Sequence, residues 1–149
     1  MRILVINGPS LNLLGLREPE IYGKETYEEL TDRLYAEAEE NGWEIDIVQT
    51  NHEGVIVDWI QDALGEYDGI VINAAAYTHT SIAIADALRA VRLPAVEVHL
   101  SDLTKREDYR RVSYLRDACI GCEMGEGVES YRKALHRLAD HLNVTGASV

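Results

Sequence analysis

The sequence predicts an α/β fold: a doubly wound, five-stranded parallel sheet with helices on both faces, in three layers α/β/α. Short β-branched runs alternate with amphipathic segments of helical length, which is typical of sheets built from strand–helix units. Five such runs fit into 149 residues, a length that suits one domain with one core. The two observations together favour a flavodoxin-like topology.

The first elements follow directly from the residues. The β-branched run Arg2 to Asn7 predicts a strand. Gly8 to Lys24 is rich in Gly, Pro, Asn and charge, so we expect a loop, and loops of this length are usually functional. Thr26 to Glu29 has the T-x-x-E form of a capping box, which starts a helix that ends near Asn41 and Gly42. Alternation from Trp43 to Ile47 predicts an edge strand with one wetter face.

The remaining elements repeat this order. They are a helix from about Gly54 to Leu64, a buried central strand Gly69 to Asn73, a helix capped by Thr80 or Ser81 that reaches Val91, a strand Pro94 to His99, a loop with Lys105, Arg106, Arg110 and Arg111, a fifth strand near Ala118 to Met124, and a helix from about Val128 to Leu142. The sequence shows no internal repeat or linker.

The composition is that of an acidic globular protein. The formal net charge is −12, and such a surface repels phosphate backbones, so we expect no nucleic-acid partner. No apolar stretch approaches the roughly 18 residues of a membrane span. No signal peptide is visible before the first strand, which makes the cytoplasm the default location and a membrane role unexpected.

Two cysteines form the C-x-x-C pattern Cys119 to Cys122. This pattern occurs in redox pairs and in halves of zinc sites, but a second pair of metal ligands is missing here. If both residues lie in the fifth strand, they point to opposite faces, roughly 10 Å apart. We therefore expect inert, partly buried thiols and no metal site.

Polar side chains gather where the predicted strands end. Open parallel sheets bind ligands at the carboxyl ends of their strands. The residues in question are Asn7 and Asn12 after the first strand, Asn73, Tyr77 and His79 after the third, and Glu97, His99 and Ser101 on and after the fourth. Polar residues also simply end strands, but Asn, His and Glu at three neighbouring ends together favour a pocket.

Glu97 and His99 are two residues apart on a strand, so their side chains share one face. A carboxylate beside an imidazole fixes its tautomer, which suits a general acid. A structural ion pair is the alternative interpretation. A metal ion on His79 and His99 lacks a third ligand with suitable spacing.

Arg17 and Tyr22 lie together in the long first loop. A free tyrosine has a pKa near 10 and is a poor base at neutral pH, but a close guanidinium stabilises the phenolate. Lowering that pKa by two units takes roughly 2.7 kcal/mol, which a partly desolvated arginine can supply. A packed loop tyrosine is the alternative.

Four sequence blocks resemble the type II 3-dehydroquinate dehydratases, nearly end to end and in register. The first block is Asn7 to Gly15 with Arg17 to Pro19 and Ile21 to Gly23, and the others are Asn51 to Gly54, Ala76 to Ser81, and Val96 to Ser101. The resemblance implies a single catalytic domain of residues 1–149 without a cofactor. It implies trans-dehydration of 3-dehydroquinate to 3-dehydroshikimate through an enolate, in the shikimate pathway or in quinate catabolism.

The same resemblance implies the catalytic roles. Tyr22 would take the C2 proton, and Arg17 would keep it ionised. Asn12 would hold a water or hydroxyl near the enolate oxygen. His99, oriented by Glu97, would protonate the departing C1 hydroxyl.

The resemblance further implies a substrate-binding set and an assembly. The binding set is Asn73, His79, Asp86, Leu100, Ser101 and Arg110. Asp86 would act across a subunit boundary, in a homo-oligomer of trimers that resembles a dodecamer. The chain departs from the family pattern at Ser10, Ala74, Ala75 and Asp102, which bears on efficiency and substrate preference.

Other functions fit the residues less well. A receiver domain needs an acidic cluster after the first strand and an Asp after the third, where Asn7 and Asn73 stand. A flavin module needs a phosphate-binding loop, and no G-x-G-x-x-G is present. A scaffold without catalysis has no use for Arg17, Tyr22 and His99 together. A Schiff-base mechanism needs a buried lysine, and we expect none.

Overall fold

A computed structural model describes residues 1–145 of the chain. Its five strands form one parallel sheet in the order β2-β1-β3-β4-β5. The strands are β1 (Arg2–Asn7), β2 (Glu44–Gln49), β3 (Gly69–Asn73), β4 (Ala95–His99) and β5 (Gly121–Met124). The predicted doubly wound, five-stranded α/β fold is confirmed.

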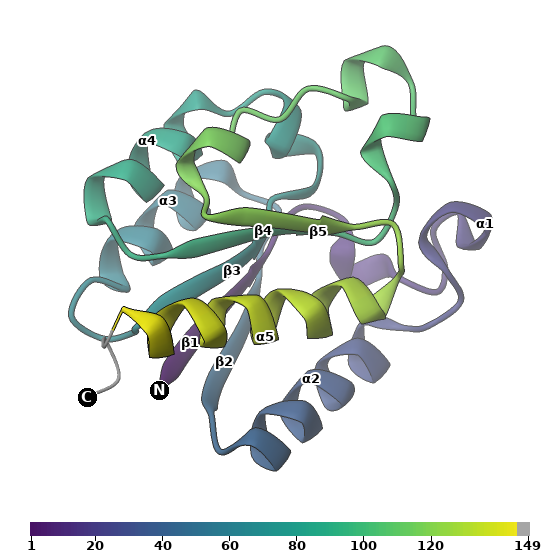
Figure 1. Cartoon of the computed structure of the whole chain (residues 1–149). Helices are drawn as coiled ribbons and strands as arrows, with labels where there is room; N and C mark the ends of the chain where they lie inside the picture. Colours follow the sequence, from purple (N-terminus) through teal and green to yellow (C-terminus); the bar gives the residue numbers. More distant parts are fainter. Residues whose placement is uncertain (146–149) are drawn as a thin grey trace.

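Helices cover both faces of this sheet (Figure 1). The longer helices are α2 (Tyr27–Asn41), α3 (Glu53–Asp62), α4 (Ile82–Val91) and α5 (Val128–Val144). Figure 1 shows α2 and α5 on one face and α3 and α4 on the other. None of the described helices is long and apolar enough to cross a membrane.

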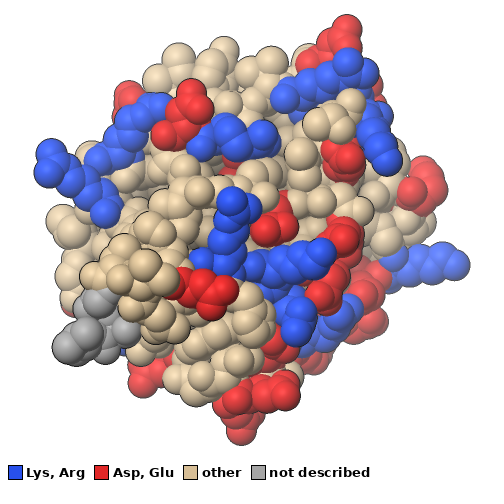
Figure 2. All heavy atoms as spheres, in the orientation of Figure 1, with Lys and Arg blue, Asp and Glu red and all other residues tan. Residues whose placement is uncertain are grey.

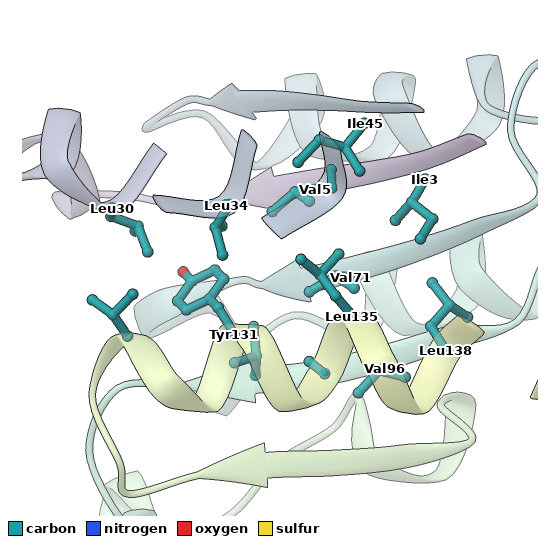
Figure 3. Packing of buried hydrophobic residues seen from close by; sticks show 14 of the residues in the cluster. Ile3, Val5, Leu30, Leu34, Ile45, Val71, Val96, Tyr131, Leu135 and Leu138 are labelled. Carbon is teal, nitrogen blue, oxygen red and sulfur yellow. The ribbon is translucent and has the colours of Figure 1, made fainter. Parts of the chain in front are cut away.

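The alternation of strand side chains makes two separate cores. On β1, Ile3 and Val5 face α2 and α5, whereas Leu4 and Ile6 face α3 and α4, and all four are buried. Figure 3 shows Tyr131 pointing from α5 into the first of these cores. Both faces of the central strands are therefore apolar, as parallel strands require.

Local signals placed the helix ends well. Thr26 caps α2, because its side-chain oxygen accepts a hydrogen bond of 3.1 Å from the backbone N–H of Glu29. Gly42 ends that helix with a φ of 73°. Ser81, rather than Thr80, caps α4 by accepting from the backbone N–H of Ile84.

Two expectations need correction. The Gly8–Lys24 segment contains a 3-10 turn, η1 (Leu11–Leu13), and a short helix, α1 (Pro19–Tyr22). The fifth strand begins only at Gly121, because the residues before it form the 3-10 turn η5 (Arg116–Ala118). Cys119 thus lies outside the strand, and the argument from strand alternation does not apply to it.

Basic and acidic groups are interspersed on the surface that Figure 2 shows. Over α2 and α5, for example, Arg132 lies between Glu37 and Glu129, at 3.3 and 2.9 Å. These exposed pairs contribute little to stability. They do show that the net charge of −12 is not spread as a uniform acidic coat.

Candidate active site

A cavity opens at the carboxyl ends of β1, β3 and β4, where the topology predicts a binding site. The open space here measures about 560 Å³, which includes solvent at the mouth. Its lining includes Ser10, Leu11, Arg17, Tyr22, Asn73, Ala75, His79, His99, Leu100, Ser101, Arg106 and Arg110. Eight of the predicted site residues lie in this one wall: Arg17, Tyr22, Asn73, His79, His99, Leu100, Ser101 and Arg110.

The ends of β1 and β3 approach each other closely at the floor of the cavity. The backbone N–H of Gly8 donates to the carbonyl oxygen of Asn73 at 2.8 Å. A Cβ atom on Gly8 would lie 2.5 Å from the carbonyl oxygen of Ala74. Only glycine fits there, and this close approach brings the loop after β1 over the end of β3.

Asn73 is held in place by a buried network. Its side-chain NH₂ donates to the hydroxyl of Tyr131 at 2.9 Å, and its oxygen accepts from the backbone N–H of Ala75 at 3.0 Å. The Tyr131 hydroxyl in turn donates to Asn7 at 2.6 Å. One amide hydrogen of Asn73 remains for a ligand, because an NH₂ group carries two.

Ala75 adopts a left-handed backbone conformation, with a φ of 52°. This region of backbone conformation is one that glycine adopts readily and alanine rarely does. For an L-residue this conformation costs roughly 1 kcal/mol. The hydrogen bond to Asn73 helps to hold it.

Glu97 is fully buried behind His99 and accepts hydrogen bonds from three side chains. His99 Nε2 lies 2.5 Å from Glu97 Oε2, the Ser113 hydroxyl donates to the same oxygen at 2.8 Å, and Arg116 Nε donates to Oε1 at 2.9 Å. Burial alone would raise the pKa of Glu97, but the hydrogen bonds from His99 and Arg116 outweigh it and hold this pKa at about 2.

This arrangement fixes the tautomer of His99. An ionised carboxylate can only accept, so Nε2 must carry a proton. Nδ1 is then the ring nitrogen left for the cavity, which His99 lines. Glu97 thus contacts the ring nitrogen of His99 that points away from the cavity.

The Cys122 thiol lies near this pair, with ligand-type atoms of Glu97, His99 and Cys122 within 4.8 Å of one another. Two ligands of one zinc ion stand more than about 3 Å apart, whereas His99 Nε2 and Glu97 Oε2 are 2.5 Å apart. The pair therefore shares a proton in this geometry. Burial, and next the charge of Glu97, raise the pKa of Cys122 to about 11, so it is a thiol at neutral pH.

Both cysteines are free and half-buried, as expected. Burial raises the pKa of Cys119 to about 12, with the charge of Glu97 the next cause. Since the thiolate is the reactive form, neither side chain is poised for thiol–disulfide exchange at neutral pH.

His79 presents its other nitrogen to the cavity in the neutral form. Its Nδ1 lies 2.7 Å from the carbonyl oxygen of Val112, which can only accept, so Nδ1 carries the proton. Burial lowers the pKa of His79, and the hydrogen bond to Val112 only partly offsets this. Nε2 is then an acceptor at neutral pH, suited to a ligand hydroxyl.

Two guanidinium groups contact the Tyr22 ring, and only that of Arg106 also donates to its hydroxyl. Arg17 stacks over the ring, with its Cζ 4.7 Å from the ring centroid. Arg106 donates to the Tyr22 hydroxyl oxygen from both terminal nitrogens, each at 3.3 Å, and also to Ser101 at 3.1 Å. The contact with the phenol oxygen therefore comes from Arg106, which the sequence indicated only as one cation of a loop.

Three predicted residues lie outside the lining. Glu97 stands behind His99, as described. Asn12 is exposed on η1, where its side-chain oxygen accepts from Gln49 at 3.4 Å. Asp86 is exposed on α4, 3.8 Å from Arg89. A single chain does not bring Asn12 or Asp86 to the cavity wall.

Asp102 does not face the cavity either. It lines a second hollow on the other side of Tyr22 and Arg106. Its carboxylate accepts from the hydroxyl and backbone N–H of Thr104, at 2.6 and 2.9 Å, and these bonds lower the pKa of Asp102. The added charge is thus engaged locally, away from the bulk of the site.

Sequence reasoning missed the residues that support the site from elsewhere. Arg106 contacts Tyr22, Ser113 and Arg116 bind Glu97, and Tyr131 binds Asn73. No spacing rule finds them, because they come from connecting segments and from the opposite core. The cluster of arginines after β4 was the one available signal.

The comparisons with known proteins agree with this geometry. Residues 1–139 match the family model described as dehydroquinase class II. The chain is 56% identical to the 3-dehydroquinate dehydratase of Carboxydothermus hydrogenoformans, over 95% of this chain and 92% of the relative. It is 51% identical to 3-dehydroquinate dehydratase 2 of Pseudomonas aeruginosa, over 93% of each chain.

Solved structures give the same answer. The type II dehydroquinase of Butyrivibrio crossotus superposes with a TM-score of 0.92 at 45% identity, covering 93% of this chain and 97% of that one. A 3-dehydroquinate dehydratase-like protein of Bifidobacterium longum reaches 0.72 at 27% identity, with 96% and 98% covered. The chain belongs to the class II dehydroquinase family.

Proposed function

We propose that the protein is a hydro-lyase that converts 3-dehydroquinate to 3-dehydroshikimate by trans-dehydration, as one catalytic domain of residues 1–149 in the cytoplasmic shikimate pathway. One observation carries the proposal: Tyr22, with Arg106 at its oxygen, and His99, with Glu97 behind it, line the same cavity. A base and an acid in one pocket are what an elimination of water requires.

The reaction needs two proton transfers, one to Tyr22 and one from His99. The Tyr22 phenolate removes the proton at C2, which is acidic because it lies next to the C3 ketone. The resulting enolate expels the C1 hydroxyl, and His99 protonates this group so that it leaves as water. Tyr22 then returns its proton to solvent and His99 regains one, so no electron acceptor is needed.

The surrounding groups suit this charge flow. Arg17 and Arg106 stabilise the phenolate and the enolate electrostatically. We assign to Asn12, which follows the lining residue Leu11, a water near the enolate oxygen. Asn73, His79, Arg110 and the backbone at Leu100 and Ser101 bind the hydroxyls and the carboxylate. We further propose a homo-oligomer of trimers, a dodecamer, in which Asp86 reaches the neighbouring subunit's cavity.

The test is incubation of the purified protein with 3-dehydroquinate, followed by the ultraviolet absorbance of the conjugated enone. We expect steady product formation without added metal or cofactor. Tyr22→Phe should reduce turnover roughly 10²- to 10⁴-fold, the usual share of a general base, while the fold is retained. Absence of signal at high enzyme concentration, or full activity of Tyr22→Phe, would refute the proposal.

A Schiff-base route predicts a different result. Lys24, Lys105 and Lys133 are the lysines of the chain, and none lies in the cavity wall. Borohydride added with substrate should therefore leave the activity intact. Inactivation with a reduced adduct on a lysine would replace the tyrosine mechanism.

A further inference from the structure

Arg116 binds the buried carboxylate of Glu97, the partner of His99. Its Nε donates to Glu97 Oε1 at 2.9 Å, and Nη2 lies 3.5 Å from Oε2. The arginine comes from η5, its side chain is 40% exposed, and it does not line the cavity. It can therefore influence the reaction without touching a ligand in the cavity, through its bonds to Glu97 and through its charge.

We propose that Arg116 is a positioning residue for the acid, which balances the charge of Glu97 so that His99 is held firmly yet still releases its proton. This inference rests on the acid role proposed for His99. It gives a role to Arg116, a residue that neither lines the cavity nor belongs to the Glu97–His99 pair.

The hydrogen bond between Glu97 and His99 has two opposing effects on an acid. A buried carboxylate must stay ionised to accept from Nε2 and fix the ring. The same negative charge stabilises the imidazolium, however, and an overstabilised imidazolium is a weak acid. The positive charge of Arg116 keeps the carboxylate ionised, and it also disfavours the nearby imidazolium, so that His99 remains an effective acid. The low pKa of Glu97 agrees with the first effect.

Ser113 shows why the charge of Arg116, beyond its hydrogen bond, matters. The serine hydroxyl also donates to Glu97, at 2.8 Å. It therefore satisfies a lone pair of the buried carboxylate without adding charge. Arg116 contributes the same kind of bond plus a full positive charge, so variants of the two residues separate the two contributions.

Other titratable and charged groups face the pair from the neighbouring elements. They are His79 on the 3-10 turn η2 (Ala75–His79), Arg110 on the 3-10 turn η4 (Asp108–Arg110), and the thiols Cys119, just before β5, and Cys122, on β5. Burial keeps His79 and both thiols neutral at pH 7. Arg110 lines the cavity, so its removal would disturb binding. Arg116 is the cation in direct contact with Glu97 that can be neutralised without touching the cavity wall.

The decisive measurement is the pH midpoint at which His99 titrates, followed by NMR of its ring and assigned with a His99→Gln variant. In Arg116→Gln and in Arg116→Met we expect this midpoint to rise by about half a unit to one unit. Arg116→Lys, which restores the charge, should move it back. Ser113→Ala, which removes a neutral donor, should shift it less than Arg116→Gln does. Arg33→Gln, a change of equal charge on the far surface of α2, should leave it unchanged.

Kinetics give a second readout. In Arg116→Gln the basic limb of the kcat/KM profile should move to higher pH by the same amount, because that limb reports the acid in the free enzyme. Turnover should fall within about tenfold at neutral pH, because a better-stabilised imidazolium is a weaker acid, with KM unchanged.

Arg116→Gln and Arg116→Met both remove the charge, so the test can still be made if one of the two variants fails to fold. An unmoved His99 midpoint in either folded neutral variant would overturn the proposal, as would a rise in KM with kcat intact. If the unmodified protein does not dehydrate 3-dehydroquinate, the proposed function fails, and the NMR midpoints still decide what Arg116 does.

Discussion

Tyr22 is the residue on which the proposed chemistry depends most, and its two arginines are not equivalent. The negative charge of a phenolate is concentrated on its oxygen. Arg106 donates to that oxygen, whereas Arg17 lies over the ring face. Because Coulomb energy falls with distance, a charge at the oxygen acts more strongly on the ionised form. The geometry thus gives Arg106 a larger share of the stabilisation than the family resemblance suggested.

This difference predicts an order of effects. Arg106→Gln should move the acidic limb of the kcat/KM profile to higher pH by about one unit, and Arg17→Gln by less than half of that. The phenolate absorbance of Tyr22, obtained by subtracting the spectrum of Tyr22→Phe, should follow the same order. Arg33→Gln serves as the surface control. A larger effect of Arg17→Gln would return the main role to the stacked arginine.

Ala75 makes a prediction about stability. Its φ of 52° is unfavourable for alanine and easy for glycine. Ala75→Gly should therefore increase the free energy of unfolding by roughly 0.5–1 kcal/mol, measured by urea denaturation. Ala76→Gly, at the next position without a positive φ, should instead destabilise the protein. Destabilisation by both changes would show that the Ala75 backbone is not strained.

At the scale of the elements, sequence periodicity predicts the strands and helices that are long enough to show it. The β-branched run of β1 and the capped helices α2 and α4 were placed to within a residue or two, because their signals are local. The sequence predicts only a loop for Gly8–Lys24, since a four-residue helix such as α1 (Pro19–Tyr22) has no periodicity to detect. The start predicted for β5 is three residues too early, because Ala118 to Ile120 are apolar whether or not they form a strand.

The candidate site divides in the same way. Asn73 and His99 end strands, so topology alone brings them together. Arg106, Arg116 and Tyr131 reach the site from turns and from α5, where the direction of a side chain depends on tertiary packing. Sequence spacing carries no record of that direction.

Tyr131 shows how an element behind the sheet sets the site. It is fully buried, donates to Asn7 and accepts from Asn73. Tyr131→Phe removes the partner of the Asn73 NH₂ group and of the Asn7 side-chain oxygen, so we expect a loss of roughly 2–3 kcal/mol in the free energy of unfolding. KM should rise as well, because the Asn73 amide loses its orientation. Tyr35→Phe, on the half-exposed face of α2, should change the free energy of unfolding by less than about 0.5 kcal/mol. Unchanged stability and KM in Tyr131→Phe would show that Asn73 is fixed by its backbone contact alone.

At the scale of the whole molecule, the charge of the cavity is opposite in sign to the net charge of the chain. The net charge is −12, yet Arg17, Arg106 and Arg110 all line the cavity. An anionic substrate is repelled by the chain as a whole and attracted by this opening. Local guanidinium groups thus provide the field that the overall charge opposes.

The exposed face of α4 is where we expect a neighbouring subunit to bind. Ile82 and Asp86 lie one turn apart on this helix, and both are exposed, Ile82 by 59%. If Asp86 completes a neighbour's cavity, two defective variants should rescue each other. Asp86→Ala keeps Tyr22, and Tyr22→Phe keeps Asp86, so a hybrid oligomer contains some sites with both groups intact.

Random mixing of the two variants in a cyclic trimer makes about one site in four intact, because each site draws one group from each of two subunits. Unfolding and refolding an equal mixture should therefore restore up to about a quarter of the normal activity, while each variant refolded alone stays near its own low level. Simple mixing without refolding controls for contamination. If the co-refolded sample shows only the mean of the two separate activities, Asp86 acts within its own subunit or not at all, because only a site shared between chains can be repaired by exchanging them.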